Sequence, residues 1–276
     1  MNKIAITIGA ALCAAGSFGA DLDLNGEWEF RFEEGKALEE VLKPDFAATR
    51  DAVRSDWGKE LARVADRTPF VQSQVVQLLQ CFARPTEGDF VLPRQGGLQR
   101  WVWPWDQSYA SAALTMLGYG EYVEMACDFY FGEYAQPDGR IGPFGMGWVN
   151  DTANVLGIFS HHCAESGNAA FWRKHREAAE RAFRWIKAER AKSANLPGQI
   201  AGLFPAGVAS DNPKVFQSWG TTDLLNLQGL ENYACAAKRF GDPAADEAAA
   251  EAADYRATIA RILDRWRRAE EDRDTF

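Results

Sequence analysis

The connections between the predicted helices alternate between two kinds, and this alternation constrains the fold more than any other feature. The long connections are rich in Gly, Pro, Trp and Asp and span residues 84–105, 135–150 and 195–215. The short ones span 118–120, 166–168 and 241–243. Helical hairpins with tight turns at one end and elaborated loops at the other stack side by side, so that the long loops share one face. We expect a pocket on that face.

From residue 51 onward, apolar residues recur at the spacing of amphipathic helices. Thr68-Pro69 is typical of a helix start, and Gly118 and Gly167 are typical of the residues that follow a helix end. The predicted helices span 69–82, 106–117, 121–131, 151–165, 169–192, 216–240 and 244–268. This makes about seven helices with no strand between them, so the sequence predicts an all-α domain.

The first 50 residues have a different character. Residues 1–20 combine Lys3 with an apolar stretch and then small residues, a pattern that predicts a secretory signal too short to span a membrane. Within residues 22–34, apolar and polar side chains alternate from Trp28 to Phe32, as in a half-buried strand, with a turn at Asn25-Gly26. The predicted organisation is therefore a signal peptide (1–20), a short β-type leader (21–50) and a helical-hairpin domain (51–276). We expect the mature protein to be exported to the periplasm or the extracellular space.

Composition narrows the class of partner. The chain is 47% hydrophobic and 12% aromatic, which predicts a globular core. Its net charge of -9, without a run of Lys and Arg, argues against nucleic acid or a membrane surface and leaves a neutral, hydroxyl-rich ligand compatible. Four cysteines follow the leader without CxxC spacing, which favours buried apolar residues over metal ligands. We expect neither a metal nor another cofactor. Nothing in the sequence indicates a disulfide pairing or an oligomeric state.

The segment Trp101–Tyr109 is the best clue to function. It places three tryptophans and Asp106 where a loop ends and a helix begins. Flat aromatic rings beside a fixed carboxylate suit a sugar, because the C–H face of the sugar stacks on the rings while its hydroxyls bond the acid. Buried tryptophans at a proline-marked helix start are the alternative. For Asp106 and Asp151 the alternative role is that of a first-turn helix acid.

These motifs, in this order, resemble the six-hairpin glycosidase superfamily, in particular its glucoamylase, trehalase and glycogen-debranching-like groups. The matching segments are 103–109, 117–119, 139–141 with 148–151, and 202–205 running to 210–211. The resemblance covers roughly residues 65–268. A second, shorter resemblance links the start of the leader to the sugar-binding domain of β-galactosidase and β-glucuronidase relatives.

The resemblance implies an (α/α)6 helical toroid and an inverting glycoside hydrolase. It assigns the general acid to Asp211 and the sugar-binding carboxylate to Asp106, with Trp103 and Trp105 lining the same subsite. Trp148 and Asp151 are further candidates for substrate contact, and Asp151 also for catalysis. A complete toroid has twelve helices, so the resemblance also implies that this domain is incomplete. No residue of the chain is identified as the catalytic base.

Two other functions remain open at this point. A protein that keeps the aromatic sugar site but lacks a base would bind carbohydrate without turnover. A helical-toroid polysaccharide lyase or sugar epimerase is the other alternative. A histidine in a long loop would favour it, but all three histidines fall within predicted helices.

Overall fold

The computed structural model describes residues 46–83, 92–93, 102–143, 148–196, 200–209 and 214–273. The predicted signal peptide and the alternating stretch at 22–34 lie outside these residues. The chain forms two compact units, one of residues 1–81 with 96–100 and one of residues 82–95 with 101–276.

The first unit contains two described helices, α2 (Phe46–Leu61) and α3 (Pro69–Gln80). The predicted start of α3 is confirmed: the Thr68 side chain accepts the backbone N–H of Val71 at 3.5 Å, and Pro69 occupies the first helical position. Helix α2 begins at Phe46, within the predicted β-type leader.

The second unit is predominantly helical, which confirms the predicted all-α class. Its helices are α4 (Pro104–Met116), α5 (Gly120–Phe129), α6 (Asp151–Ser166), α7 (Ala169–Ala191), α8 (Gly220–Arg239) and α9 (Ala245–Arg273). A π-helical turn, η1 (Tyr130–Tyr134), extends α5. The predicted stops at Gly118 and Gly167 are confirmed, since these residues follow α4 and α6 with φ of 84° and 69°, a left-handed conformation that glycine adopts without strain. The predicted stop at Gly132 is wrong, because η1 continues through it.

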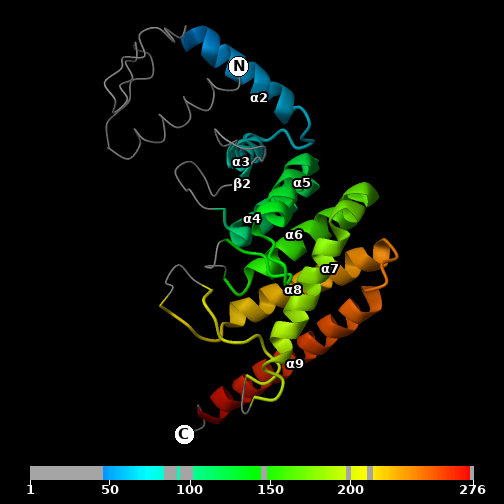
Figure 1. Cartoon of the computed structure of the whole chain (residues 1–276). Helices are drawn as coiled ribbons and strands as arrows, with labels where there is room; N and C mark the ends of the chain where they lie inside the picture. Colours follow the sequence, from blue (N-terminus) through cyan, green and yellow to red (C-terminus); the bar gives the residue numbers. More distant parts are fainter. Residues whose placement is uncertain are drawn as a thin grey trace, which may run out of the picture. The chain divides into compact units, whose positions relative to one another are not determined.

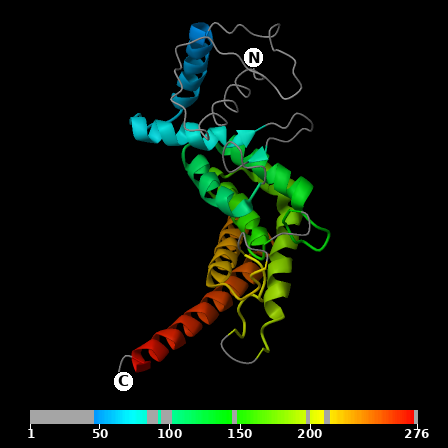
Figure 2. The ribbon, with the colours of Figure 1, turned by 90° about the vertical axis from the view of Figure 1, so that its left-hand side faces the viewer.

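The helices of this unit pack in two layers (Figures 1 and 2). Helix α6 packs against α4 on one side and α8 on the other, and these three form the first layer. Helix α5 contacts α4 and α6, α7 contacts α6 and α8, and α9 contacts α8, so these three form the second layer. Every residue from Asp151 to Ser160 is buried, because α6 packs against four helices, α4, α5, α7 and α8.

The first-layer helices α6 and α8 approach closely at small residues. A Cβ atom added to Gly229 of α8 would lie 2.5 Å from the carbonyl oxygen of Ala153 in α6. A Cβ on Gly157 of α6 would meet its nearest atoms, in α8, at 3.6 Å. Gly229 is therefore required for this helix contact, whereas Gly157 leaves room for a methyl group.

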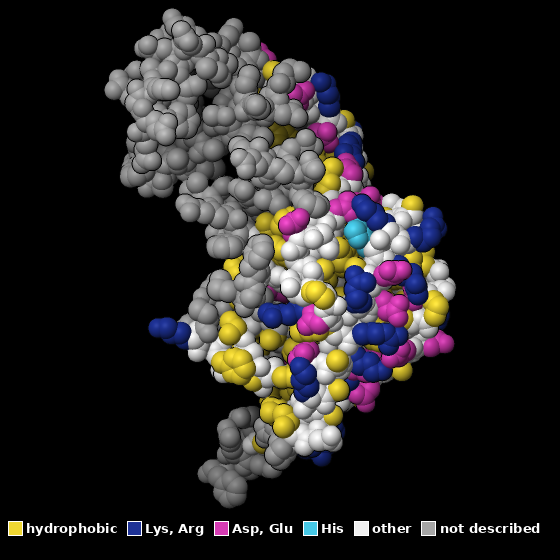
Figure 3. Space-filling view, in the orientation of Figure 1, with side chains coloured by type: hydrophobic (Ala, Val, Ile, Leu, Met, Phe, Trp, Pro, Cys, Tyr) yellow, Lys and Arg dark blue, Asp and Glu magenta, His cyan; other side chains and the backbone are white. Residues whose placement is uncertain are grey.

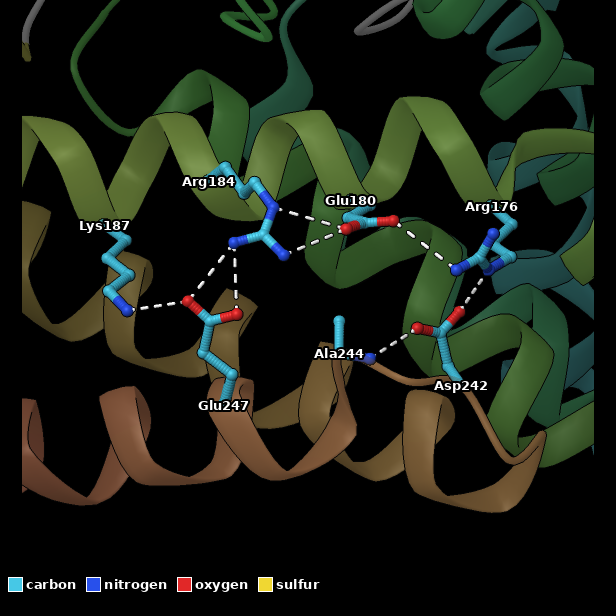
Figure 4. Close-up of polar contacts among 7 residues, drawn as sticks. All are labelled: Arg176, Glu180, Arg184, Lys187, Asp242, Ala244 and Glu247. Carbon is cyan, nitrogen blue, oxygen red and sulfur yellow. Dashed lines mark hydrogen bonds and ion pairs between the residues drawn. The ribbon is translucent and has the colours of Figure 1, made fainter.

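Ion pairs join α7 to α9 and to the residues just before α9 (Figure 4). Glu247 of α9 accepts hydrogen bonds from Arg184 and Lys187 of α7, at 3.1 and 2.7 Å. Asp242 receives the Nε–H of Arg176 at 2.5 Å and the backbone N–H of Ala244 at 2.9 Å. In the space-filling view, basic and acidic side chains intermingle over the surface around α7 (Figure 3). This face is a solvated, charge-balanced exterior.

Two details differ from the sequence-based expectation. Two short strands, β1 (Phe82–Ala83) and β2 (Leu92–Pro93), form an antiparallel pair between helices, where the sequence predicted none. Helix α8 begins at Gly220 and not at Phe216, because Gln217 pairs with Gly207 in an isolated β-bridge.

Among the described residues, no helix is long and apolar enough to cross a membrane.

Candidate functional site

The three long loops meet at the N-terminal ends of α4, α6 and α8. The indole of Trp103, from the first loop, stacks on that of Trp148, from the second, with ring centroids 4.4 Å apart and planes 12° apart. The backbone N–H of Val149 donates to the carbonyl of Val208 in the third loop at 3.1 Å. The predicted convergence of the long loops is therefore present in this unit.

Short β-type pairs stabilise each loop. The first loop carries β1 and β2, the second an isolated bridge between Ala135 and Ile141, and the third the bridge between Gly207 and Gln217. Thr152 of α6 also fixes the second loop, because its hydroxyl accepts the N–H of Ile141 at 2.9 Å. These contacts position the loops on the helix ends.

Three predicted site residues, Trp103, Trp105 and Trp148, form one aromatic cluster. Trp105 meets Trp148 edge to face at 6.1 Å, so Trp148 contacts both other indoles. Trp148 is only 9% exposed, whereas Trp103 and Trp105 are partly exposed. Trp148 therefore supports the cluster from inside, and the surface available to a ligand belongs to Trp103 and Trp105.

Asp151 begins α6 beneath this cluster, and its carboxyl group is completely buried. Its Oδ2 accepts the backbone N–H of Trp148 at 2.8 Å, while its Oδ1 is buried with no hydrogen-bond partner among the described residues. Burial raises the pKa of Asp151 to about 7, and the charge of Asp106 adds to the increase. The backbone hydrogen bond and Arg140 oppose it. Near neutral pH this carboxyl can therefore exist in both protonation states.

Asp106 lies in the first turn of α4, where its side chain is exposed. The N-cap residue of α4, Trp103, makes no side-chain capping bond. Asp106 is thus the exposed carboxylate of the site, and Asp151 is the buried one.

The π-turn η1 adds two tyrosines that the sequence analysis did not identify. Tyr130 is fully buried, and its hydroxyl has no hydrogen-bond partner among the described residues. Burial raises its pKa, with further contributions from Cys127, Tyr134, Asp151 and Asp106. Burial and Asp151 also raise the pKa of Tyr134 to about 12. π-turns often occur at functional sites, but the sequence gave no signal for this one beyond an aromatic run before Gly132.

Asp211 lies outside the described residues, but the loop that leads to it is anchored. Asp223 of α8 accepts the backbone N–H of Phe204 at 2.7 Å and the hydroxyl of Tyr255 at 2.5 Å. The guanidinium of Arg190 lies 4.4 Å from the Tyr255 ring and donates to the carbonyl of Gly202 at 2.8 Å. Burial is the largest effect on Asp223 and raises its pKa, against the hydrogen bonds from Tyr255 and Phe204. Asp223 therefore ties the third loop to α8 and α9.

All three histidines lie in helices, as expected. His162 of α6 contacts the Thr115 hydroxyl at 3.1 Å and Glu124 at 3.2 Å. His175 of α7 lies 2.6 Å from Asp128, and burial lowers its pKa. His161 is partly exposed and faces the first-layer groove described below. None of the three belongs to the loop cluster.

The cysteines of the described chain, Cys81, Cys127, Cys163 and Cys235, carry free thiols. No group of His, Cys, Asp and Glu side chains within the described ranges has the arrangement of a metal site. The chemistry available in the loop cluster is that of aromatic faces, two carboxyl groups and a buried phenol.

No family model, curated protein or solved structure matches this chain.

Proposed function

We propose that the protein is an exported glycoside hydrolase that cleaves O-glycosidic bonds of an oligo- or polysaccharide by an inverting mechanism with two carboxyl groups. The observation that carries this proposal is the convergence of three loop tryptophans with Asp106 and Asp151 at one end of adjacent helices. Partly exposed indole faces beside carboxyl groups match the stacking and hydrogen-bonding needs of a neutral sugar. Closure of the helical hairpins into a toroid is part of the same proposal.

The proposed roles follow from exposure and protonation. Trp103 and Trp105 stack on the sugar, and the exposed Asp106 binds its hydroxyls. Glycoside hydrolysis requires one protonated carboxyl for the leaving oxygen and one ionised carboxylate to activate water. Asp211 is the proposed general acid. Asp151 is the second candidate for that role, because its pKa of about 7 keeps much of it protonated near neutral pH.

The test is sugar release from a panel of neutral substrates, namely starch, maltooligosaccharides, trehalose, mixed-linkage β-glucan and xylan. The proposal predicts release from at least one of them, with inverted anomeric configuration in the product by NMR. Asp211→Asn is expected to abolish release while sugar binding remains. If Asp211→Asn is fully active and Asp151→Asn is not, Asp151 takes the role of acid. No release from any substrate would contradict the hydrolase proposal.

A carbohydrate-binding protein without turnover is the second candidate. One observation favours it: the Asp151 carboxyl is completely buried and bound to the Trp148 backbone, as expected of a structural group. This alternative predicts saturable sugar binding that depends on Trp105, with no product in the same assays. A lyase or epimerase has less support, since none of the histidines belongs to the loop cluster.

A further inference from the structure

A shallow groove runs along the first helical layer, separate from the tryptophan cluster. It is lined by side chains from all three first-layer helices, among them Ser108 and Tyr109 of α4, Asn154 and His161 of α6, and Leu225 and Gln228 of α8. The groove begins about one helical turn inside the loop cluster, because Asn154 follows Asp151 by three residues.

The lining of this groove mixes polar and apolar side chains and carries no fixed charge. None of the described residues that line it is Asp, Glu, Lys or Arg. Tyr109 is 65% exposed and offers an aromatic face, and Gln228 is also exposed. An aromatic wall with amide groups and no charge suits an uncharged ligand that carries hydroxyl groups.

One buried side chain in the groove lacks a partner. Asn154 is 4% exposed, and its amide nitrogen is buried without a hydrogen-bond acceptor among the described residues. Buried amide donors are normally satisfied by protein or by bound molecules. A turn of the Asn154 side chain toward the groove would bring this donor to an acceptor oxygen of a ligand or of an ordered water.

The size of the groove limits the ligand. Its volume is about 80 Å³, several times the roughly 10–15 Å³ that one water molecule requires. It is well below the roughly 300–1,000 Å³ of pockets for larger ligands. The groove therefore has room for part of one small ring and not for a chain of rings.

We infer that this groove is a binding site for a single uncharged sugar ring. Tyr109 stacks on the ring, and Asn154 donates to one of its oxygens. The site is distinct from the loop cluster of the proposed function, so each can be tested without the other.

The experiment is saturation-transfer NMR on the full chain, with D-glucose, D-galactose, D-mannose and D-xylose as neutral probes and D-glucuronate as the charged one. We expect saturable, millimolar binding of at least one neutral sugar and weaker binding of glucuronate. Tyr109→Ala should bind the neutral sugar about threefold to tenfold more weakly than the parent. The control is Met116→Ala, on the same helix and 79% exposed but outside the groove lining, which should bind as the parent does.

Asn154→Leu separates a ligand site from a site that holds only water. Leu matches Asn in size and removes the unpaired donor, so the sugar-free variant should be at least as stable as the parent. It should also bind the neutral sugar about tenfold more weakly. If Asn154→Leu and Tyr109→Ala both bind the neutral sugar as tightly as the parent does, or if the parent shows no saturable binding of any probe, the inference is overturned.

Trp105→Ala distinguishes the two sites. This variant lacks an aromatic face of the loop cluster and is expected to keep monosaccharide binding in the groove. If Trp105→Ala loses the monosaccharide while Tyr109→Ala keeps it, the sugar binds at the loop cluster and the groove assignment is wrong. Rejection of the groove as a sugar site therefore does not contradict the proposed function.

Discussion

At the scale of single residues, burial of the Asp151 carboxyl links the candidate site to the stability of the fold. Its pKa of about 7 lies above the value of 3.8 expected for an accessible Asp. Between these values the folded protein holds one proton more than the unfolded chain. The free energy of unfolding therefore falls as pH rises from about 4 to about 7 and is not lowered further above that window.

Asp151→Asn should remove this pH dependence. The difference of about three pKa units corresponds to about 4 kcal/mol at most, and Asn can still accept the Trp148 N–H. Urea unfolding at pH 4.5 and 7.5 is the measurement, with the parent losing stability relative to the variant as pH rises. Asp106→Asn, at an exposed carboxylate, is the control and should keep most of the parent's slope. If the free energy of unfolding changes equally with pH in the parent and in Asp151→Asn, the Asp151 carboxyl is not held protonated.

Asp242 is a second residue whose role the structure defines. It accepts Arg176 Nε–H and the backbone N–H of Ala244 just before α9. Asp242→Ala removes a charged hydrogen bond and a helix cap, which should lower the free energy of unfolding by about 2–4 kcal/mol. Asp242→Asn can keep the capping bond and should therefore lose less stability than Asp242→Ala. Equal stability of the parent and Asp242→Ala in urea unfolding would contradict this role.

At the scale of elements, the contact between α6 and α8 makes a sharp prediction about two glycines. Gly229→Ala places a methyl group 2.5 Å from the Ala153 carbonyl oxygen, so the helices must separate. We expect Gly229→Ala to lower the free energy of unfolding by about 1–3 kcal/mol or more. Gly157→Ala meets only ordinary contacts at 3.6 Å and should be neutral or stabilising by about 0.5–1 kcal/mol, because Ala favours a helix. Thermal unfolding of both variants is the measurement, and the same effect from both would refute the close contact.

The sequence predicted helix boundaries well where local chemistry determines them. Thr68-Pro69 starts α3 and Gly167 ends α6 through interactions among neighbouring residues. The sequence-based prediction was wrong where a contact with a distant residue determines the helix boundary. Gln217 is drawn into a bridge with Gly207, which delays the start of α8, and the π-turn continues α5 through Gly132. Neither effect has a periodic signature in the chain.

At the scale of the whole second unit, the alternation of long and short connections predicted that the three loops would meet on one side. The composition of the loops also predicted which residues gather there, since Trp103, Trp105 and Trp148 form one cluster. The sequence did not predict that Trp148 is the buried member of the cluster or that Tyr130 belongs to the site. Both depend on packing between segments far apart in sequence. The groove at Asn154 likewise results from the packing of three helices, so periodicity could not reveal it.

The central claim is that the loop cluster binds carbohydrate, and calorimetric titration with neutral oligosaccharides tests it most directly. The parent protein should bind at least one oligosaccharide, and Trp105→Ala should bind it at least about tenfold more weakly. The matched control is Trp266→Ala, which removes a 42% exposed tryptophan of α9 outside the cluster and should bind as the parent does. No binding by the parent, or equal binding by the parent and Trp105→Ala, would contradict the assignment of this site.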